Sequence, residues 1–341
     1  MNSLLIGENS WIFHNKPVIV STGVVGGPFE GKGKISSSFD KIHDDIWINE
    51  KSFEKAQRII FEDACKIALE KHGVNEDQVN YFIGGDLINQ ITPSTFTAKT
   101  LAIPYFGLFS ACATSMEGLA LAAFIINSGG AQNILTGTAS HNAATERQFR
   151  YPSEYGGQKP PTAQWTVTGA GCALVSNVGN GPVVTKATIG KVIDMGLTDP
   201  FNMGGAMAPA AVDTIIRHVA DFQITPDHYD VILTGDLGEI GLAASYDLLR
   251  EKGFDIDEGH IVDCGLSIYN DDQTIHAGAS GTASSAVATY GHFLEQLKKG
   301  KYNKILVVAT GALHSPLTVQ QNESIPCIAH AVAIERSEFI T

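Results

Sequence analysis

The sequence predicts an α/β fold with two pseudo-symmetric halves, residues 1–180 and 181–341. Two observations lead to this prediction. Strand-like apolar runs alternate along the chain with amphipathic helical segments, which is typical of a mostly parallel sheet covered by helices on both faces. In addition, residues 212–237 repeat residues 62–87 without a gap. Two copies of one unit in a single chain imply a pseudo-twofold core with a pocket where the copies meet.

The elements of the first half follow from local patterns. The run PVIVST predicts a strand at 17–22, and the glycine-rich GVVGGP after it predicts a turn. Residues 28–48 are polar and irregular, which indicates a surface insertion. Apolar side chains at a 3.6-residue spacing predict a helix over 51–71. The next expected elements are a strand ending at 84–86, a helix near 94–101, a strand at 104–108, a helix from Cys112 and a strand at 133–138.

The second half repeats these elements in the same order. Residues 183–193 are expected to repeat the opening strand, 305–309 the strand at 133–138, and 326–335 the run at 169–176. Asp271 and Asp272 predict a turn between two short strands, GLSIY and TIHAG. Four identical pairs occupy matching positions in the repeat: Asp63 and Asp213, Asp77 and Asp227, Gly85 and Gly235, and Asp86 and Asp236.

The composition is that of an ordinary globular protein and excludes several classes of partner. The 341 residues carry a formal net charge of −13, with 44% apolar and 17% charged residues. An acidic chain does not suit nucleic acid, which requires clustered Lys and Arg, or direct adhesion to an anionic membrane. No apolar run approaches the roughly 18 residues of a membrane-spanning helix. The N-terminal segment also lacks the basic start and long apolar run of a signal peptide. We therefore expect no nucleic-acid partner, no direct membrane span and no signal peptide.

The cysteines give no indication of a metal or a disulfide framework. They lie far apart, without a CxxC pair, and their number is odd, which favours a reducing compartment. The glycine-rich stretch at 23–34 lacks the GxxxxGK[ST] spacing of a phosphate loop. No cofactor and no metal site are predicted. The cysteines are at positions 65, 112, 172, 264 and 327.

The stretch 106–123, FGLFSACATSMEGLALAA, contains the candidate reactive residue. The small residues Ser110 and Ala111 precede Cys112, and helical periodicity begins directly after them. A cysteine in the first turn of a helix faces unpaired backbone N–H groups and the positive end of the helix dipole. This position favours the thiolate, which is the nucleophilic form. The alternative is an inert, buried Cys112, because free cysteines are among the most buried residues.

The duplication together with Cys112 resembles the thiolase superfamily, which includes thiolases and ketoacyl synthases. The resemblance rests on SACATSMEG around Cys112 and on IHAGASGTASS at 275–285, which is similar to the thiolase GHPxGASG motif. It implies a thiolase-like, five-layered αβαβα fold. It also implies that Cys112 occupies the position of the family's nucleophile and His276 that of one of its partners.

One residue departs from this family pattern. After the strand at 231–234 the family places a His or an Asn, whereas this chain has Asp236. An ionised carboxylate opposes the negative charge of an oxyanion and, if close, disfavours the thiolate of Cys112. Alternatively, Asp236 caps a helix or turn, as we expect of Asp86 in the first copy. Under both interpretations the condensing apparatus is incomplete, and Cys112 is expected to be a vestigial nucleophile.

A more specific resemblance is to the stage V sporulation protein AD (SpoVAD) family. It rests on residues 139–163, ASHNAATERQFRYPSEYGGQKPPTA, on FSACATSMEG, on the repeated GDL, and on residues 314–332. The resemblance implies a non-catalytic protein that binds dipicolinic acid (pyridine-2,6-dicarboxylate), with or without calcium, and supports its uptake into the developing spore. It further implies the other SpoVA proteins as partners, a peripheral place at the spore inner membrane through them, and a homodimer.

Hydrogen-bond donors and cations near the pocket are the residues expected to bind such a flat aromatic dianion. Backbone N–H groups at Cys112 and Ala113 suit a carboxylate. His141 and Asn142 follow a strand of the first half and can donate hydrogen bonds. The other candidates are Arg147, Arg150 and Lys159 in the polar loop 145–162, His276, and His314 with Ser315.

Each candidate also has a structural interpretation, and three functions remain open. The cations can pair with Glu146 and Glu154 on the surface, and a single histidine is more often a structural hydrogen-bonding residue. The predicted function is dipicolinate binding without catalysis. One alternative is an acyl-transfer or condensing enzyme with Cys112 as its nucleophile. The other is a purely structural subunit of a membrane complex.

Overall fold

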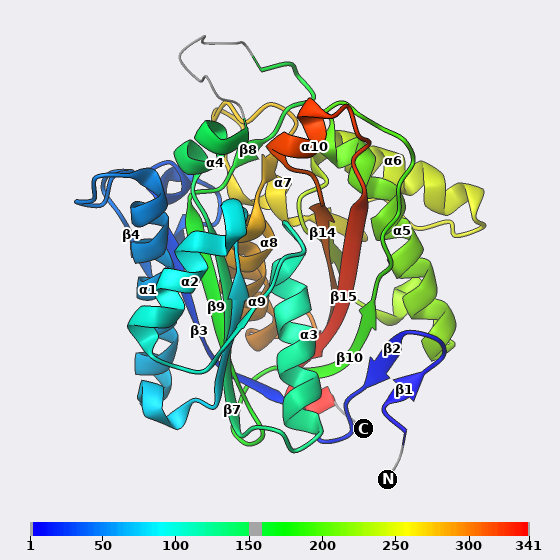
Figure 1. Ribbon diagram of the computed structural model, residues 1–341. Coiled ribbons are helices and arrows are strands. Elements are labelled where there is room, and N and C mark those ends of the chain that lie inside the picture. Colours follow the sequence, from blue (N-terminus) through cyan, green and yellow to red (C-terminus); the bar gives the residue numbers. More distant parts are fainter. Residues whose placement is uncertain (1–2, 150–158, 340–341) are drawn as a thin grey trace.

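The computed structural model describes residues 3–149 and 159–339, and two half-sheets of five strands each form its framework (Figure 1). Both half-sheets have the same strand order counted from the centre of the molecule. In the first half the order is β3 (Val18–Gly26), β9 (Gly169–Ser176), β7 (Asn133–Ser140), β5 (Tyr81–Gly85) and β6 (Tyr105–Gly107). In the second half it is β10 (Val183–Ile189), β15 (Cys327–Glu335), β14 (Lys304–Ala312), β11 (Val231–Thr234) and β12 (Ile261–Asp263).

Strand directions are also the same in the two halves. The second strand of each half, β9 or β15, is antiparallel to both of its neighbours, and the outer three strands are parallel. The half-sheets meet at an antiparallel pair, Val18 with Val183. The predicted α/β fold with two pseudo-symmetric halves is therefore confirmed. We propose that the halves divide between β9 and β10, at the predicted boundary of residues 180–181.

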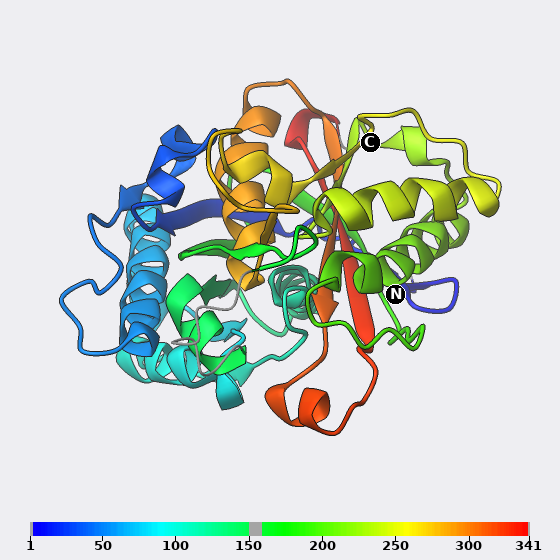
Figure 2. The same ribbon diagram turned by 90° about the horizontal axis from the view of Figure 1, so that it is seen from above.

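Helices complete five layers (Figures 1 and 2). Helices α1 (Phe53–His72) and α2 (Thr92–Leu101) cover the outer face of the first half-sheet. Helices α5 (Met203–Phe222) and α6 (Gly238–Glu251) lie outside the second half-sheet. Between the half-sheets lies α3, which Figure 2 shows end-on near the centre of the molecule. The middle layer comprises α3 (Thr114–Asn127), α8 (Thr282–Val287), a π-helical turn at Ala288–Phe293, and α9 (Leu294–Lys298).

The central layer explains why the helix at residues 114–127 is mostly apolar and has no polar face. Met116 and Leu119 of α3 are fully buried in a cluster that includes Ile134 of β7 and Val332 of β15. Complete burial of such side chains stabilises the fold by about 1.5–3 kcal/mol each. Two further apolar clusters lie between the outer helices and the half-sheets. A helix that is buried on every side needs no polar face.

Short elements connect these layers. The hairpin of β1 (Leu5–Ile6) and β2 (Ser10–Ile12) pairs with β10, and β4 (Lys41–Ile42) pairs with β3. Outside the main sheet, β8 (Trp165–Thr166) pairs with β13 (Ala279–Ser280) and so connects the two halves. The remaining α-helices of the described residues are α4 (Asn142–Phe149), α7 (Cys264–Ile268) and α10 (Pro316–Gln320). None of the helices in the described ranges has the length and apolar character required to cross a membrane.

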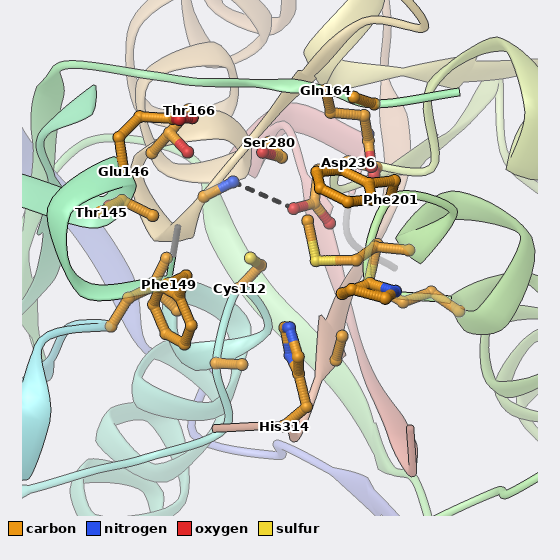
Figure 3. Close-up of a pocket in the computed structure, with 18 of the residues that line it drawn as sticks. Cys112, Thr145, Glu146, Phe149, Gln164, Thr166, Phe201, Asp236, Ser280 and His314 are labelled. Carbon is orange, nitrogen blue, oxygen red and sulfur yellow. Dashed lines mark hydrogen bonds between the residues drawn. The ribbon is translucent and has the colours of Figure 1, made fainter. Parts of the chain in front are cut away.

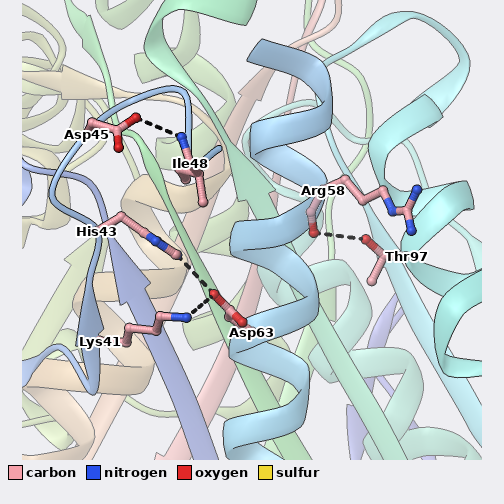
Figure 4. Close-up of polar contacts among 7 residues, drawn as sticks. All are labelled: Lys41, His43, Asp45, Ile48, Arg58, Asp63 and Thr97. Carbon is pink, nitrogen blue, oxygen red and sulfur yellow. Dashed lines mark hydrogen bonds and ion pairs between the residues drawn. The ribbon is translucent and has the colours of Figure 1, made fainter. Parts of the chain in front are cut away.

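The segment before α1 is fixed to that helix by an aspartate of the sequence repeat (Figure 4). Asp63 Oδ2 lies 2.6 Å from Lys41 Nζ and 2.9 Å from His43 Nε2. Its counterpart in the second half, Asp213, forms an ion pair with Lys191 at 3.2 Å. In both halves the aspartate of the repeat thus forms an ion pair between the outer helix and a lysine of another segment.

The turn predicted after residue 22 is wrong, because Gly23 and Gly26 lie within β3. Gly23 pairs with Cys172 of β9. A Cβ atom at Gly23 would lie 2.0 Å from the carbonyl oxygen of Ala64 in α1. This glycine therefore permits α1 to approach the sheet closely. A glycine within a strand commonly marks a site where another backbone approaches.

Four other local predictions also need correction. Residues 142–149 form α4 rather than the start of a loop. The expected strand GLSIY instead lies largely in α7, because Asp263 accepts a hydrogen bond from Leu266 N at 3.2 Å and caps this helix. TIHAG is not a strand either, since β13 begins only at Ala279. Helix α3 begins at Thr114, so Cys112 lies in the turn before the helix.

Candidate functional site

A cavity of about 120 Å³ lies where the two halves meet, beyond the carboxyl ends of the parallel strands (Figure 3). Ligands of open α/β sheets commonly bind at this edge. Side chains from both halves line the cavity, and most of its wall is apolar or aromatic. The polar and aromatic lining includes Cys112, Thr145, Glu146, Phe149, Lys159, Gln164, Phe201, Asp236 and His314.

The turn that carries Cys112 has an unusual backbone conformation. Ala111 has φ +47°, a left-handed value that costs free energy for a residue with a Cβ atom. Ser110 Oγ donates a hydrogen bond to Glu117 Oε2 at 2.7 Å and fixes the turn to α3. A Cβ atom at Gly311 of β14 would lie 2.2 Å from Ser110 O, so this glycine lets the second half approach the turn.

The environment of Cys112 favours the thiol. Burial raises the pKa of the Cys112 thiol well above its ordinary value, and the neighbouring Asp236 carboxylate raises it further. Backbone N–H groups lower the pKa but do not offset these effects. The prediction that the helix N-terminus would favour the thiolate is therefore wrong. The expectation that a nearby Asp236 disfavours the thiolate is confirmed.

Asp236 lies at the base of the cavity and is fully buried. Its Oδ2 accepts a hydrogen bond from Gly281 N at 3.1 Å (Figure 3). Its Oδ1 accepts one from Thr310 Oγ1 at 2.9 Å. Burial raises the pKa of Asp236 to about 7, and the nearby Asp263 carboxylate contributes to the increase. The side chain can thus exchange a proton near neutral pH.

A second aspartate caps the helix that follows Asp236. Asp263 Oδ2 accepts hydrogen bonds from Leu237 N at 2.8 Å and Thr234 Oγ1 at 2.7 Å. The interpretation of Asp236 as the cap of this turn is therefore wrong, since Asp263 has that role. In the first half, Asp86 does cap as predicted, because its carboxylate accepts from Ile88 N at 2.7 Å and Ser94 N at 2.9 Å.

An ion pair and aromatic rings form another part of the cavity wall. Lys159 Nζ lies 2.6 Å from Glu146 Oε1 and 5.3 Å from the centre of the Trp165 ring. The rings of Phe149 and His314 stack with centroids 5.5 Å apart. Burial lowers the pKa of His314, so its imidazole is neutral at neutral pH. The cavity thus combines flat apolar surfaces with one lysine.

Gln164 is a lining residue that sequence analysis missed. Its Nε2 donates to the carbonyl oxygens of Asp236 at 2.7 Å and Ala279 at 3.0 Å. Its buried Oε1 has no hydrogen-bond partner among the described residues, and the same is true of Thr145 Oγ1 and His314 Nδ1. Gln164 reaches the cavity through the non-local pairing of β8 with β13, which no local sequence pattern reveals.

The structure brings together only part of the predicted site. Cys112, Lys159 and His314 line the cavity, and Ala113 lies fully buried behind Cys112 at the start of α3. Arg147 and Ser315 line an adjacent, wider groove, which shares Phe149 and His314 with the cavity. Arg150 and Glu154 lie outside the described residues.

Three predicted ligand residues lie elsewhere. The buried His141 forms a hydrogen bond between its Nε2 and Ile46 O at 2.8 Å, and thereby holds the loop before α1. Asn142 N and Nδ2 donate to Thr168 Oγ1 and Thr166 O. His276 is exposed, with φ +57°, in the turn before β13. Neither His141, Asn142 nor His276 lines the described cavity.

The described residues contain no group of three or more His, Cys, Asp or Glu side chains that could hold a metal ion. The interpretation that a loop cation pairs with Glu146 is confirmed for Lys159. This pair, however, lines the cavity and is not merely a surface contact, because both side chains are largely buried.

Comparison with solved structures supports the thiolase-like fold. The structure is similar to 3-oxoacyl-[acyl-carrier-protein] synthase III from Aquifex aeolicus, with a TM-score of 0.56, 15% identity, and coverage of 94% of this chain and 99% of that chain. It is also similar to OleA from Xanthomonas campestris, with a TM-score of 0.58, 13% identity, and coverage of 98% and 99%. At these identities the similarity shows the fold alone.

Sequence comparison is more specific. Residues 7–335 match the family model of stage V sporulation protein AD (SpoVAD). The chain is 48% identical to stage V sporulation protein AD of Bacillus subtilis over 333 residues, which cover 98% of each chain. This chain, with its thiolase-like fold, therefore belongs to the SpoVAD family, as its sequence motifs predicted.

Proposed function

We propose that this chain binds dipicolinic acid without transforming it, and that it supports uptake of the acid into the developing spore together with the other SpoVA proteins. The observation that carries the proposal is the pairing of Cys112 with Asp236 inside an enclosed cavity where the two halves meet. A buried thiol beside a carboxylate is a poor nucleophile. The same cavity still offers an enclosed volume for a small ligand.

The cavity has the shape and chemistry for a flat aromatic acid. Phe149, Phe201 and the neutral His314 provide flat surfaces for a pyridine ring. Lys159 provides a cation for one carboxylate. The relative in Bacillus subtilis is named as a sporulation protein, which agrees with a ligand of the spore.

Direct titration of the purified chain with disodium dipicolinate tests this proposal. We expect saturable heat and a higher thermal unfolding midpoint. The isomer pyridine-3,5-dicarboxylate is the control and should have little effect, because its carboxylates are not adjacent to the ring nitrogen. An absence of both heat and thermal shift at saturating dipicolinate would refute dipicolinate binding.

Lys159→Ala is expected to weaken dipicolinate binding about tenfold or more, because a hydrogen bond to a charged group contributes about 1.5–3 kcal/mol. Lys191→Ala removes a lysine from a surface ion pair with Asp213 and is the matched control. His141→Ala should leave the affinity within about twofold, since His141 lies outside the cavity. Equal loss of affinity in all three variants would contradict this assignment.

Intact-mass measurement distinguishes binding from acyl transfer. We expect no mass increase after incubation with a panel of acyl-coenzyme A thioesters, because the Cys112 thiol is buried and protonated. A thioester adduct that Cys112→Ala abolishes would instead establish acyl transfer.

We further propose a homodimer that associates with the spore inner membrane through its partner proteins. Among the strands of the described residues, the edge strand β6 pairs with β5 alone, and three exposed aromatic side chains lie on or near it. A strand edge with exposed apolar side chains is suited to pairing with another chain. The three side chains are Phe96, Phe106 and Phe109.

A further inference from the structure

The cavity is poorly suited to a dianion unless a positive charge enters with it. Among the described lining residues, Lys159 is the one permanent cation, and Glu146 lies 2.6 Å from it. Asp236 adds a second carboxylate, while Cys112 and His314 are neutral. With Asp236 ionised, the described lining therefore carries a net negative charge before any ligand enters.

Asp236 is the group that a carboxylate ligand would meet at the base of the cavity. Both of its oxygens already accept hydrogen bonds, from Gly281 N and Thr310 Oγ1. A ligand carboxylate next to an ionised Asp236 would add a repulsive contact in an apolar enclosure. Two carboxylates in such a site share a proton, because they cannot both remain ionised at low cost.

Among the titratable groups around Asp236, Asp236 itself is the one expected to take up this proton. Cys112 before α3, Cys264 in α7 and Cys327 in β15 are thiols whose pKa burial raises, so they remain protonated and uncharged. Asp263, at the end of β12, accepts hydrogen bonds from Thr234 Oγ1 and from three backbone N–H groups. Burial raises the pKa of Asp263, and these four donors oppose that increase by stabilising its charged form.

We propose that each dicarboxylate enters the cavity together with one proton, which Asp236 holds and donates as a hydrogen bond to a ligand carboxylate. This inference rests on the proposed function, since it concerns the form in which that ligand is bound. Binding would then convert the ionised Asp236 into its acid, and the ligand would remain a dianion. The number of protons taken up equals the fraction of Asp236 that is ionised before binding.

Isothermal titration with disodium dipicolinate in phosphate, HEPES and Tris buffers measures this uptake. The slope of the apparent enthalpy against the buffer ionisation enthalpy gives the number of protons. With the pKa of Asp236 at about 7, the slope should be close to one proton at pH 8 and close to zero at pH 6. The dissociation constant should increase about tenfold per pH unit above pH 7.5.

Variants assign the proton to a residue. Asp236→Asn should abolish the slope at pH 8. Asp86→Asn, which changes the symmetry-related aspartate outside the cavity, should retain it, and so should Glu146→Gln. If Asp236→Asn does not fold, two other measurements still test the proposal. They are the difference between the wild-type slopes at pH 6 and pH 8, and the slope of Glu146→Gln at pH 8.

The outcomes separate the two proposals. Dipicolinate binding with no slope at pH 8, a slope that persists in Asp236→Asn, or a slope lost in Glu146→Gln would each overturn proton uptake at Asp236 and leave the binding function standing. The absence of binding heat at both pH values would overturn both.

Discussion

Asp236 lies fully buried beside Cys112, although burial of an ionised carboxylate destabilises a folded protein. Its pKa of about 7 lies well above the value of 3.8 expected in the unfolded chain. The unfolded state therefore releases this proton more readily, and the folded state loses stability as the pH increases from about 4 to about 7. A buried residue that lowers the stability of the fold in this way is more readily explained by a role in a binding site than by a role in the hydrophobic core.

Asp236→Asn is expected to have a higher thermal unfolding midpoint than the wild type at pH 8, because the asparagine cannot ionise. The difference should shrink as the pH decreases to 5, where Asp236 is protonated in the folded state. Thermal unfolding of both proteins at pH 5, 7 and 8 measures this. A difference that does not depend on pH would show that ionisation of Asp236 is not the cause.

Single residues were also where sequence reasoning was least complete. Cys112 and Lys159 could be predicted to lie at the pocket, because one precedes a helix and the other is a cation in an acidic chain. Gln164 and Phe201 could not, since they reach the cavity through pairing and packing between distant segments. His141 follows a strand as predicted, but the loop before α1 occupies its hydrogen-bonding nitrogen.

At the scale of elements, close packing of α1 against β3 depends on Gly23. Gly23→Ala is expected to lower the free energy of unfolding by about 2–3 kcal/mol, because the added methyl group would overlap the Ala64 carbonyl oxygen and displace the helix. Urea unfolding of the two proteins measures the change. A free energy within about 0.5 kcal/mol of the wild type would contradict the requirement for glycine at this position.

Gly23 also illustrates what limited the prediction of elements. Helices α1 and α2 and strands β5 and β7 could be predicted, because each carries a clear apolar period or run. Glycines in β3 indicated a turn, since a local pattern does not show that a helix packs against them. In α7 the capping residue Asp263 outweighed the apparent strand pattern of GLSIY.

At the scale of the whole molecule, the repeat was the most informative feature of the sequence. Residues 62–87 and 212–237 form α1 with β5 and α5 with β11, which are equivalent elements of the two half-sheets. The pocket between the copies followed from this symmetry. The charges inside the pocket could not be predicted from the repeat, because they depend on which side chains of the two copies meet there.

The proposed dimer is a property of the whole molecule and has a direct test. Phe106→Asp should convert a dimer into a monomer in size-exclusion chromatography with light scattering, because a charge would be buried at the β6 edge. Val178→Asp, at an exposed position in the turn after β9, should leave the dimer intact. A wild-type chain that elutes as a monomer at micromolar concentration would contradict the proposal.

A crystal structure of the chain with dipicolinate is the most direct test of the central claim that a thiolase-like cavity serves here as a receptor. The account predicts the ligand intact in the cavity, with one carboxylate near Lys159, the other at Asp236, the ring against Phe149, and no bond to Cys112. Dipicolinate bound outside this cavity, or an empty cavity at saturating ligand, would contradict it.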